Sequence, residues 1–197
     1  MAKDISAILQ SLLEKVKKRG YSEDEILRVA AAQGDQLLDK FADAIAQAAR
    51  KPRETLPVTV NYDLSVEEAI AAGDYQAVNA DISGKNFSWA EKGKADLEVT
   101  LVRFDQRMSS ENVVRGLEEE GLRPAELPEL LAFGAAYPDV QRQFSVVGLG
   151  SVWRDRRGER NVPCLYAASE GRYLDLHWWD DGWYTFSRFA ALRKQKR

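Results

Sequence analysis

The last third of the chain limits the fold more than any other stretch, because four strand-like segments follow one another there. They cover residues 144–153, 162–168, 173–179 and 186–193. Gly follows a polar residue between consecutive segments, which is the usual signal of a hairpin turn. These signals are Arg157–Gly158, Glu170–Gly171 and Asp181–Gly182. They predict a sheet of consecutive hairpins.

Alternation within the third segment predicts two unlike faces, since a strand places successive side chains on opposite sides of its sheet. One face holds Leu174, Leu176 and Trp178, and the other holds Tyr173, Asp175, His177 and Trp179. We expect the first face to lie in the core, and we expect the same of Trp153. We expect the second face to be exposed, together with Tyr184.

The stretch from Asp96 to Gly134 predicts a strand and two helices. Leu97, Val99 and Leu101 alternate with Glu98, Thr100 and Val102 in the strand. Ser109 and Ser110 then cap a helix that ends at Gly121, and Pro124 and Pro128 introduce a second helix that stops near Gly134. Upstream, residues 56–64 alternate as a strand, Ser65 and Glu68 form a capping box, and residues 74–94 are irregular with one short strand.

The N-terminal stretch predicts two amphipathic helices. A capping box at Ser22 and Glu25 opens the second helix, Gly34–Asp35 divides it, and Lys51–Arg53 ends it. We expect the two apolar stripes to pack on each other as a helical hairpin; oligomerisation or docking through residues 5–50 is the alternative. The stripes are Ile5, Ile8, Leu9, Leu12, Leu13 and Val16, and Ile26, Leu27, Leu37, Leu38, Phe41 and Ile45.

These patterns predict an α+β protein with three segments. Residues 1–55 form the helical hairpin, residues 56–95 form a connecting strand and helix, and residues 96–197 form a ligand-binding domain. The order within the last segment is strand, helix, helix and four strands.

Composition excludes several classes of function. A net charge of -3 lacks the basic excess of a dedicated nucleic-acid binder. Gln10, Ser11 and Glu14 interrupt the N-terminal apolar residues, and no stretch approaches the roughly 20 apolar residues of a membrane span. We expect a soluble, cytoplasmic protein, with later export in a larger particle left open.

The candidate chemical groups are few. His177 and Cys164 are the only His and Cys, too few for a common zinc site. No G-x-S-x-G sequence accompanies His177, so we expect no catalytic residue, no metal and no cofactor. Cys164 is expected to be a buried, inert thiol. A hydrolase that uses His177 as its base remains the alternative.

Three local sequences give the C-terminal half a resemblance to the C-type lectin-like fold. GLRPAELPELLAFG (121–134) resembles the entry to the second helix in disulfide-free bacterial members, LGSVW (149–153) resembles a strand of theirs, and SRFAALR (187–193) resembles their closing strand. The resemblance implies that the closing strand pairs with the first strand of the domain. Enzymes of this fold use a cysteine pair, and calcium-binding lectins use Glu-Pro-Asn or Gln-Pro-Asp; neither occurs here.

Within that fold, the C terminus is similar to the variable proteins of diversity-generating retroelements. Adenine mutagenesis in these systems converts Asn codons into codons for a limited set of residues at the ligand-contacting positions. The resemblance implies a fixed scaffold of Leu165, Leu174, Leu176, Trp178, Trp183, Arg188 and Phe189. It implies ligand contacts, to which we add the aromatic Trp179, at Tyr166, Ala168, Ser169, Tyr173, Asp175, His177, Trp179, Asp181, Gly182, Tyr184, Thr185 and Ser187.

We therefore expect a non-enzymatic, receptor-type protein that binds another macromolecule, a protein, through residues 166–187. The alternatives are the His177 hydrolase and a structural accessory protein of a phage or plasmid. The first 95 residues lie outside the resemblance.

Overall fold

The computed structural model describes residues 5–49 and 55–194, without the side chains of residues 5–9, 30, 38 and 41–49. The chain divides into two units, Met1–Pro52 and Arg53–Arg197. The first unit contains helices and the second contains a large mixed sheet with helices, so the mixed α and β composition is confirmed.

The first unit consists of α1 (Ile5–Lys17) and α2 (Glu23–Ala49). The capping box at the start of α2 is confirmed, because the Ser22 N–H donates to Glu25 Oε2 at 2.8 Å and the Glu25 N–H donates to Ser22 Oγ at 3.3 Å. Gln33 leaves helical geometry with φ −135° and ψ 21°, one residue before Gly34. The interruption expected at Gly34 is therefore present.

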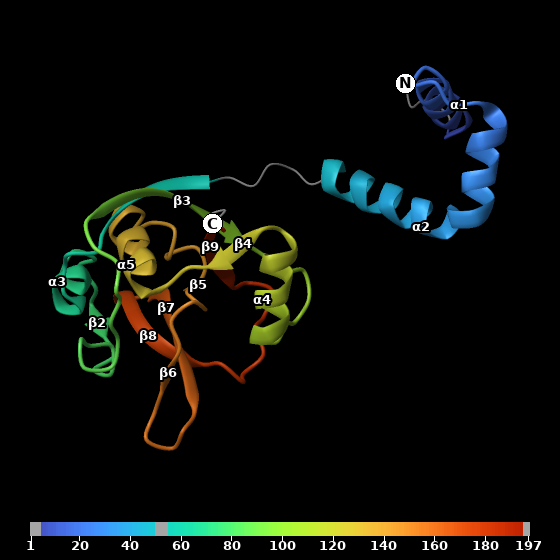
Figure 1. Ribbon diagram of the computed structural model, residues 1–197. Helices are drawn as coiled ribbons and strands as arrows, with labels where there is room; N and C mark the ends of the chain where they lie inside the picture. Colours follow the sequence, from blue (N-terminus) through green and yellow to red (C-terminus); the bar gives the residue numbers. More distant parts are fainter. Residues whose placement is uncertain (1–4, 50–54, 195–197) are drawn as a thin grey trace. The chain divides into compact units, whose positions relative to one another are not determined.

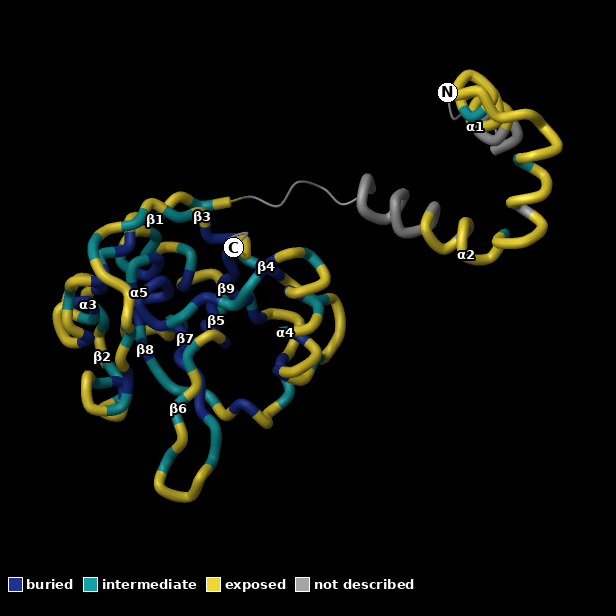
Figure 2. The backbone as a smooth tube through the Cα atoms, viewed as in Figure 1, coloured by how far each residue is buried: buried dark blue, intermediate teal, exposed yellow. Residues whose placement is uncertain are grey.

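The expected packing of one stripe on the other is wrong for the described side chains. Leu12, Leu13 and Leu37 are 39–41% exposed and Leu27 is 61% exposed. Neither hydrophobic cluster contains a described residue of α1 or α2, and Figure 2 shows the described parts of both helices as mostly exposed. Several predicted positions lie outside the described side chains or residues: Ile5, Ile8, Leu9, Leu38, Phe41, Ile45 and Lys51–Arg53.

The second unit is built around one sheet (Figure 1). Its helices are α3 (Val66–Ala71), α4 (Ser110–Glu119) and α5 (Leu127–Ala136). The strands of the described chain run in the order β1-β3-β9-β5-β7-β8-β2, while β4 pairs with β9 and β6 pairs with β7. Their bounds are β1 Thr55–Asn61, β2 Ala77–Val78, β3 Lys94–Val102, β4 Leu122–Pro124, β5 Val146–Val147, β6 Trp153–Arg154, β7 Arg160–Ala168, β8 Gly171–Trp178 and β9 Arg188–Arg193.

Two of the three predicted hairpins form. Strand β7 pairs antiparallel with β6 on one side and with β8 on the other. The hairpin expected at Asp181–Gly182 is wrong, because β9 pairs with β3, β4 and β5 and lies away from β8. Residues 179–187 instead form a crossing loop between β8 and β9.

The single strand expected at residues 144–153 is also wrong, since only β5 and β6 form there. The intervening glycines lie against the chain before α5: the Gly150 N–H donates to the Ala125 carbonyl at 2.9 Å. A Cβ on Gly150 would lie 2.7 Å from that oxygen, too close for any side chain. This contact draws the segment out of the sheet.

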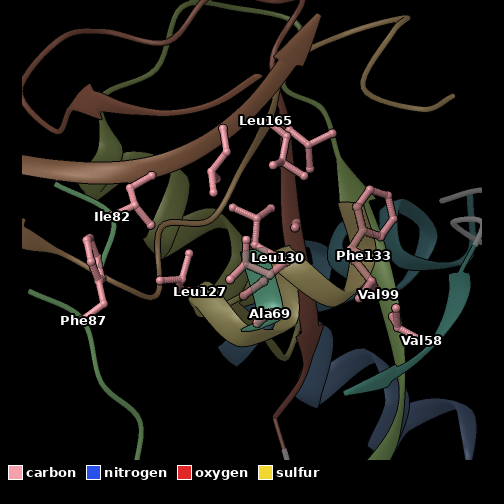
Figure 3. Close-up of a cluster of buried hydrophobic side chains, with 14 of the residues drawn as sticks. Val58, Ala69, Ile82, Phe87, Val99, Leu127, Leu130, Phe133 and Leu165 are labelled. Carbon is pink, nitrogen blue, oxygen red and sulfur yellow. The ribbon is translucent and has the colours of Figure 1, made fainter. Parts of the chain in front are cut away.

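Both faces of the central strands are buried, because alternate residues enter two different hydrophobic clusters. On β9, Ala190 and Leu192 belong to the first cluster and Phe189 and Ala191 to the second. Helix α5 covers the first face, where Figure 3 shows Leu130 below Leu165 and Phe133 beside Val99. Helix α4 covers the second face through Val113 and Leu117, and Figure 1 shows α5 and α4 on opposite sides of β9 and β5.

Residues 56–95 share the first cluster with the rest of this unit. Val58, Val66, Ile82 and Phe87 are buried in the same cluster as Leu130. The segment boundary expected between residues 95 and 96 falls inside β3. Residues 56–95 are therefore part of the same folded unit as residues 96–194.

A buried carboxylate joins the start of α5 to β1 and β4. Glu129 is 2% exposed and accepts hydrogen bonds from Arg123 Nη1 at 2.9 Å, from the Tyr62 hydroxyl at 3.1 Å and from the Glu126 N–H at 2.8 Å. Burial, followed by the negative charge of Glu129, raises the pKa of Tyr62 well above its usual range, so this hydroxyl stays a donor. Glu129 thus orients the first turn of α5 on the sheet.

Replacing Glu129 by alanine is expected to lower the free energy of unfolding by about 3 kcal/mol, because Arg123 loses its carboxylate partner and the Tyr62 hydroxyl loses its acceptor. Urea unfolding would measure the loss. Glu118→Ala is the matched control, since Glu118 forms an exposed pair with Lys194 at 2.9 Å and should cost less than about 1 kcal/mol. Equal losses in the two variants would contradict the role given to Glu129.

Candidate functional site

The crossing loop 179–187 is fastened to the start of α4. The N–H groups of Met108 and Trp183 each donate to the other residue's carbonyl, at 3.1 and 2.8 Å. The Ser110 hydroxyl is fully buried; it donates to the Trp179 carbonyl at 2.6 Å and accepts from Trp183 Nε1 at 2.8 Å. One serine in the first turn of α4 therefore binds two points of the loop.

A cavity of about 250 Å³, called the loop cavity below, lies between this loop and strands β7 and β8. On the strands it is lined by cross-strand neighbours of one face: Cys164 lies opposite Asp175, and His177 lies two residues further along β8. Seven of the twelve predicted contact residues line it: Tyr166, Asp175, His177, Asp181, Gly182, Tyr184 and Ser187. The structure thus brings together residues from two strands and the loop.

Aromatic rings form much of the wall. The His177 and Trp183 rings are 4.7 Å apart between centroids, and the Tyr184 and Phe186 rings are stacked at 5.9 Å. Tyr184 is 57% exposed and Phe186 is 60% exposed. Trp183 is therefore a buried part of the wall, whereas the Tyr184–Phe186 pair is exposed to solvent.

Two carboxylates contribute negative charge. Asp175 accepts from Asn79 Nδ2 and from the Leu176 N–H, both at 2.7 Å, so its position is fixed by β2 and by its own strand. Burial raises the pKa of the Cys164 thiol to about 12, and the charge of Asp175 adds to this shift. Cys164 is a buried neutral thiol, as expected. Asp181 Oδ2 lies 3.6 Å from His177 Nε2.

Four of the remaining predicted contacts lie outside the lining. Tyr173 stacks on Tyr166 with centroids 5.2 Å apart, so it extends the same face. Ala168 and Ser169 are exposed at the β7–β8 turn, and Thr185 is exposed on the loop. These positions are on the surface around the cavity, but not in it.

The exposures expected for the two adjacent tryptophans are reversed. Trp178 is 51% exposed and Trp179 is 9% exposed. Strand β8 ends at Trp178, so the alternation stops there. The Trp179 N–H donates to the Arg160 carbonyl at 2.8 Å, and its indole N–H donates to Glu111 of α4. Trp179 therefore closes the second cluster instead of contacting a ligand.

Sequence reasoning did not find two residues of this region, Phe186 and Asn79. Phe186 was expected in a strand, while Trp183 was expected both in the scaffold and among the aromatic residues of the recognition surface. Asn79 reaches Asp175 because β2 pairs parallel with β8, a pairing between residues far apart in the chain. The aromatic residues on either side of Thr185, which are Tyr184 and Phe186, are the only sequence signal that points to this wall.

The contacts of His177 bear on the alternative of a hydrolase. In the part of the chain that the structure describes, His177 forms no hydrogen bond to a serine hydroxyl, and its polar partner is Asp181. The same described residues contain no group of three or more His, Cys, Asp or Glu side chains suited to a metal ion.

The mixed-charge hairpin 154–160 is held by Asp155, which accepts from the N–H groups of Arg157 and Glu159 at 2.8 and 2.9 Å.

No protein-family model, curated protein or solved structure matches this chain. Among the described helices, none combines the length and the apolar character required to cross a membrane.

The two tryptophans provide a paired stability test. Trp179→Ala is expected to lower the free energy of unfolding by about 3–5 kcal/mol, because it empties a buried site. Trp178→Ala should change it by less than about 1 kcal/mol, because half of that side chain is already in water. Urea unfolding of both variants measures the difference, and a larger loss at Trp178 would contradict the burial described here.

Proposed function

We propose that this chain is a receptor-type binding protein that recognises a protein ligand through the loop cavity and the exposed side chains around it. One observation carries this proposal. Tyr166, Asp175, His177 and Tyr184, which were chosen from sequence as ligand contacts, converge with three further predicted residues on a single cavity. Aromatic side chains with polar tips give large contact area at low entropic cost, which suits recognition.

The scaffold proposed is a C-type lectin-like domain. The antiparallel pairing of β9 with β3, with Thr100 opposite Ala191, supports it, because the resemblance implies that the closing strand pairs with the first. The order of β3, α4 and α5 before the C-terminal strands also agrees with that resemblance.

We further propose that the contact residues are diversified, as in the variable proteins of retroelements. The separation of scaffold from surface supports this: Leu165, Leu174 and Phe189 are at most 2% exposed. Core packing tolerates few changes of volume, whereas exposed positions tolerate most. Substitution at Tyr184 or Asp181 would therefore alter the surface and preserve the fold. Three positions depart from this separation: the predicted contacts Ser187 and Trp179 are 4% and 9% exposed, and the scaffold residue Trp178 is 51% exposed.

A hydrolase remains less well supported. Nucleophilic catalysis needs a base within about 3.2 Å of the nucleophile, and the described contacts of His177 are Asp181 and the Trp183 ring. A buried neutral Cys164 is not a nucleophile either.

Sequencing the gene from independent isolates tests the proposal. We expect substitutions to concentrate at Tyr166, Asp175, Asp181 and Tyr184 and to spare the buried scaffold positions. We also expect a nearby reverse transcriptase gene and a near-copy of the codons for residues 166–187 that differs mainly at adenines. Invariant residues 166–187 across isolates, with no such copy, would remove diversification. A turnover abolished by His177→Ala with binding intact would overturn the receptor function.

For the first unit we propose self-association with a second copy of the chain. The exposed leucines of α1 and α2 leave an apolar face without a described partner. Basic side chains gather at residues 15–19 and acidic ones at residues 23–25. Lys17 and Glu23 pair within one chain at 2.7 Å. Lys15 or Lys18 of one copy can meet Asp24 of the other. Such pairing would bring several copies of the binding face into one assembly, which increases avidity.

Leu12→Asp and Leu27→Asp, each made in the full chain, are expected to shift the protein from dimer or higher oligomer to monomer in sedimentation velocity. A charge placed in an apolar interface is strongly unfavourable. Ser11→Asp is the matched control, because Ser11 is exposed and lies outside the apolar stripe. A wild-type chain that sediments as a monomer at all concentrations would contradict self-association.

A further inference from the structure

The size of the loop cavity fits a single side chain. Its volume is about 250 Å³, whereas clefts for small organic ligands measure about 300–1,000 Å³. At about 30 Å³ for each water, it holds about eight groups of that size, which is close to the number of heavy atoms in one long side chain. A protein ligand would therefore place one side chain in the cavity and lie on the surface around it.

The charge of the lining is negative. Asp175 and Asp181 contribute carboxylates, and no Lys or Arg is among the described residues that line the cavity. Asp175 is held by Asn79 and by the Leu176 N–H, while Asp181 is 55% exposed and has the neighbouring His177 ring as its described partner. One carboxylate is thus fixed in the wall and the other is accessible at the mouth.

Like the two carboxylates, the aromatic rings of the wall favour a positively charged ligand group. The face of an aromatic ring attracts cations, and the attraction grows when the cation is shielded from water. Tyr184 already shows this, because the Arg107 guanidinium lies 5.0 Å from its ring centroid.

The two nearby arginines lie outside the described lining. Arg107 rests on Tyr184 and beside Gly182. Arg188 donates to the carbonyl oxygens of Thr185, Phe186 and Ser187 at 3.2–3.3 Å and stacks on Phe144. Carbonyl groups and rings are thus the described partners of these two guanidinium groups, and neither forms a described ion pair with Asp175 or Asp181.

We propose that the loop cavity binds a lysine or arginine side chain of the protein ligand, held by Asp175 and Asp181 between the rings of Tyr166, Trp183 and Tyr184. This inference rests on the proposed binding function and names the chemistry of its anchor. Asp181 meets the cation at the mouth, and the rings contact the methylene groups of its side chain.

The test uses the full chain with three probes: N-acetyl-lysine amide, N-acetyl-arginine amide and N-acetyl-norleucine amide, a neutral analogue of the first. Indole resonances and tryptophan fluorescence report binding, because Trp183 forms part of the wall. We expect dissociation constants of about 1 mM for at least one basic probe and at least tenfold weaker binding of the norleucine probe. Added salt should weaken the basic probe further.

Asp181→Asn is expected to weaken the basic probe about fivefold, the upper range for an exposed ion pair. Asp180→Asn is the matched control: Asp180 is adjacent and exposed but pairs with Arg160, outside the cavity. It should leave the dissociation constant unchanged. Both positions are exposed, so neither change should disturb the fold.

The remaining outcomes overturn the inference. Equal binding of the norleucine probe would make the cavity an apolar site. An unchanged constant in Asp181→Asn would remove Asp181 from the anchor. Either result overturns the inference as stated and leaves the receptor function standing. Absence of binding by all three probes would also exclude a basic anchor. A separate measurement tests the proposed diversification: residues 166–187 that are invariant among sequenced isolates would contradict it.

Discussion

Burial of both faces of the central strands is the constraint on which the rest of the second unit depends. Strands β9, β7 and β5 contribute alternate residues to two clusters, and each cluster needs its own cover. Helix α5 supplies one cover and helix α4, with Trp179 and Trp183, supplies the other. Each residue turned into a cluster removes apolar surface from water, at about 25 cal/mol per Å². Both covers are therefore needed to keep these strands out of water.

The candidate site is a consequence of the second cover. The chain leaves β8 beside α4 and must reach β9 at the other side of β7 and β5. Ser110 fixes the loop where it crosses, through the Trp179 carbonyl and the Trp183 indole. Beyond that point Tyr184 and Phe186 turn outward and enclose the loop cavity with Asp175 and His177. Rigid support on one side and exposed rings on the other are what a binding surface requires.

Local sequence signals predicted most elements of the fold, because each depends on neighbouring residues. The capping boxes at Ser22 and Ser65, the cap at Ser109 and the β7–β8 hairpin all involve groups a few residues apart. The errors arose where distant segments compete. Gly150 lies on Ala125 and divides a predicted strand, and β9 joins β3 instead of β8.

The sequence by itself determined the period of β1, β3, β7 and β8, the helix caps at Ser22, Ser65 and Ser109, the single cysteine and most residues of the candidate site. Only the tertiary structure decided which strands are neighbours, that Trp179 lies inside and Trp178 outside, and that Asn79 holds Asp175. The physical reason is the range of the interactions. Periodicity and capping depend on residues a few positions apart in the sequence. Sheet order and cavity shape depend on contacts between residues as far apart as Asn79 and Asp175.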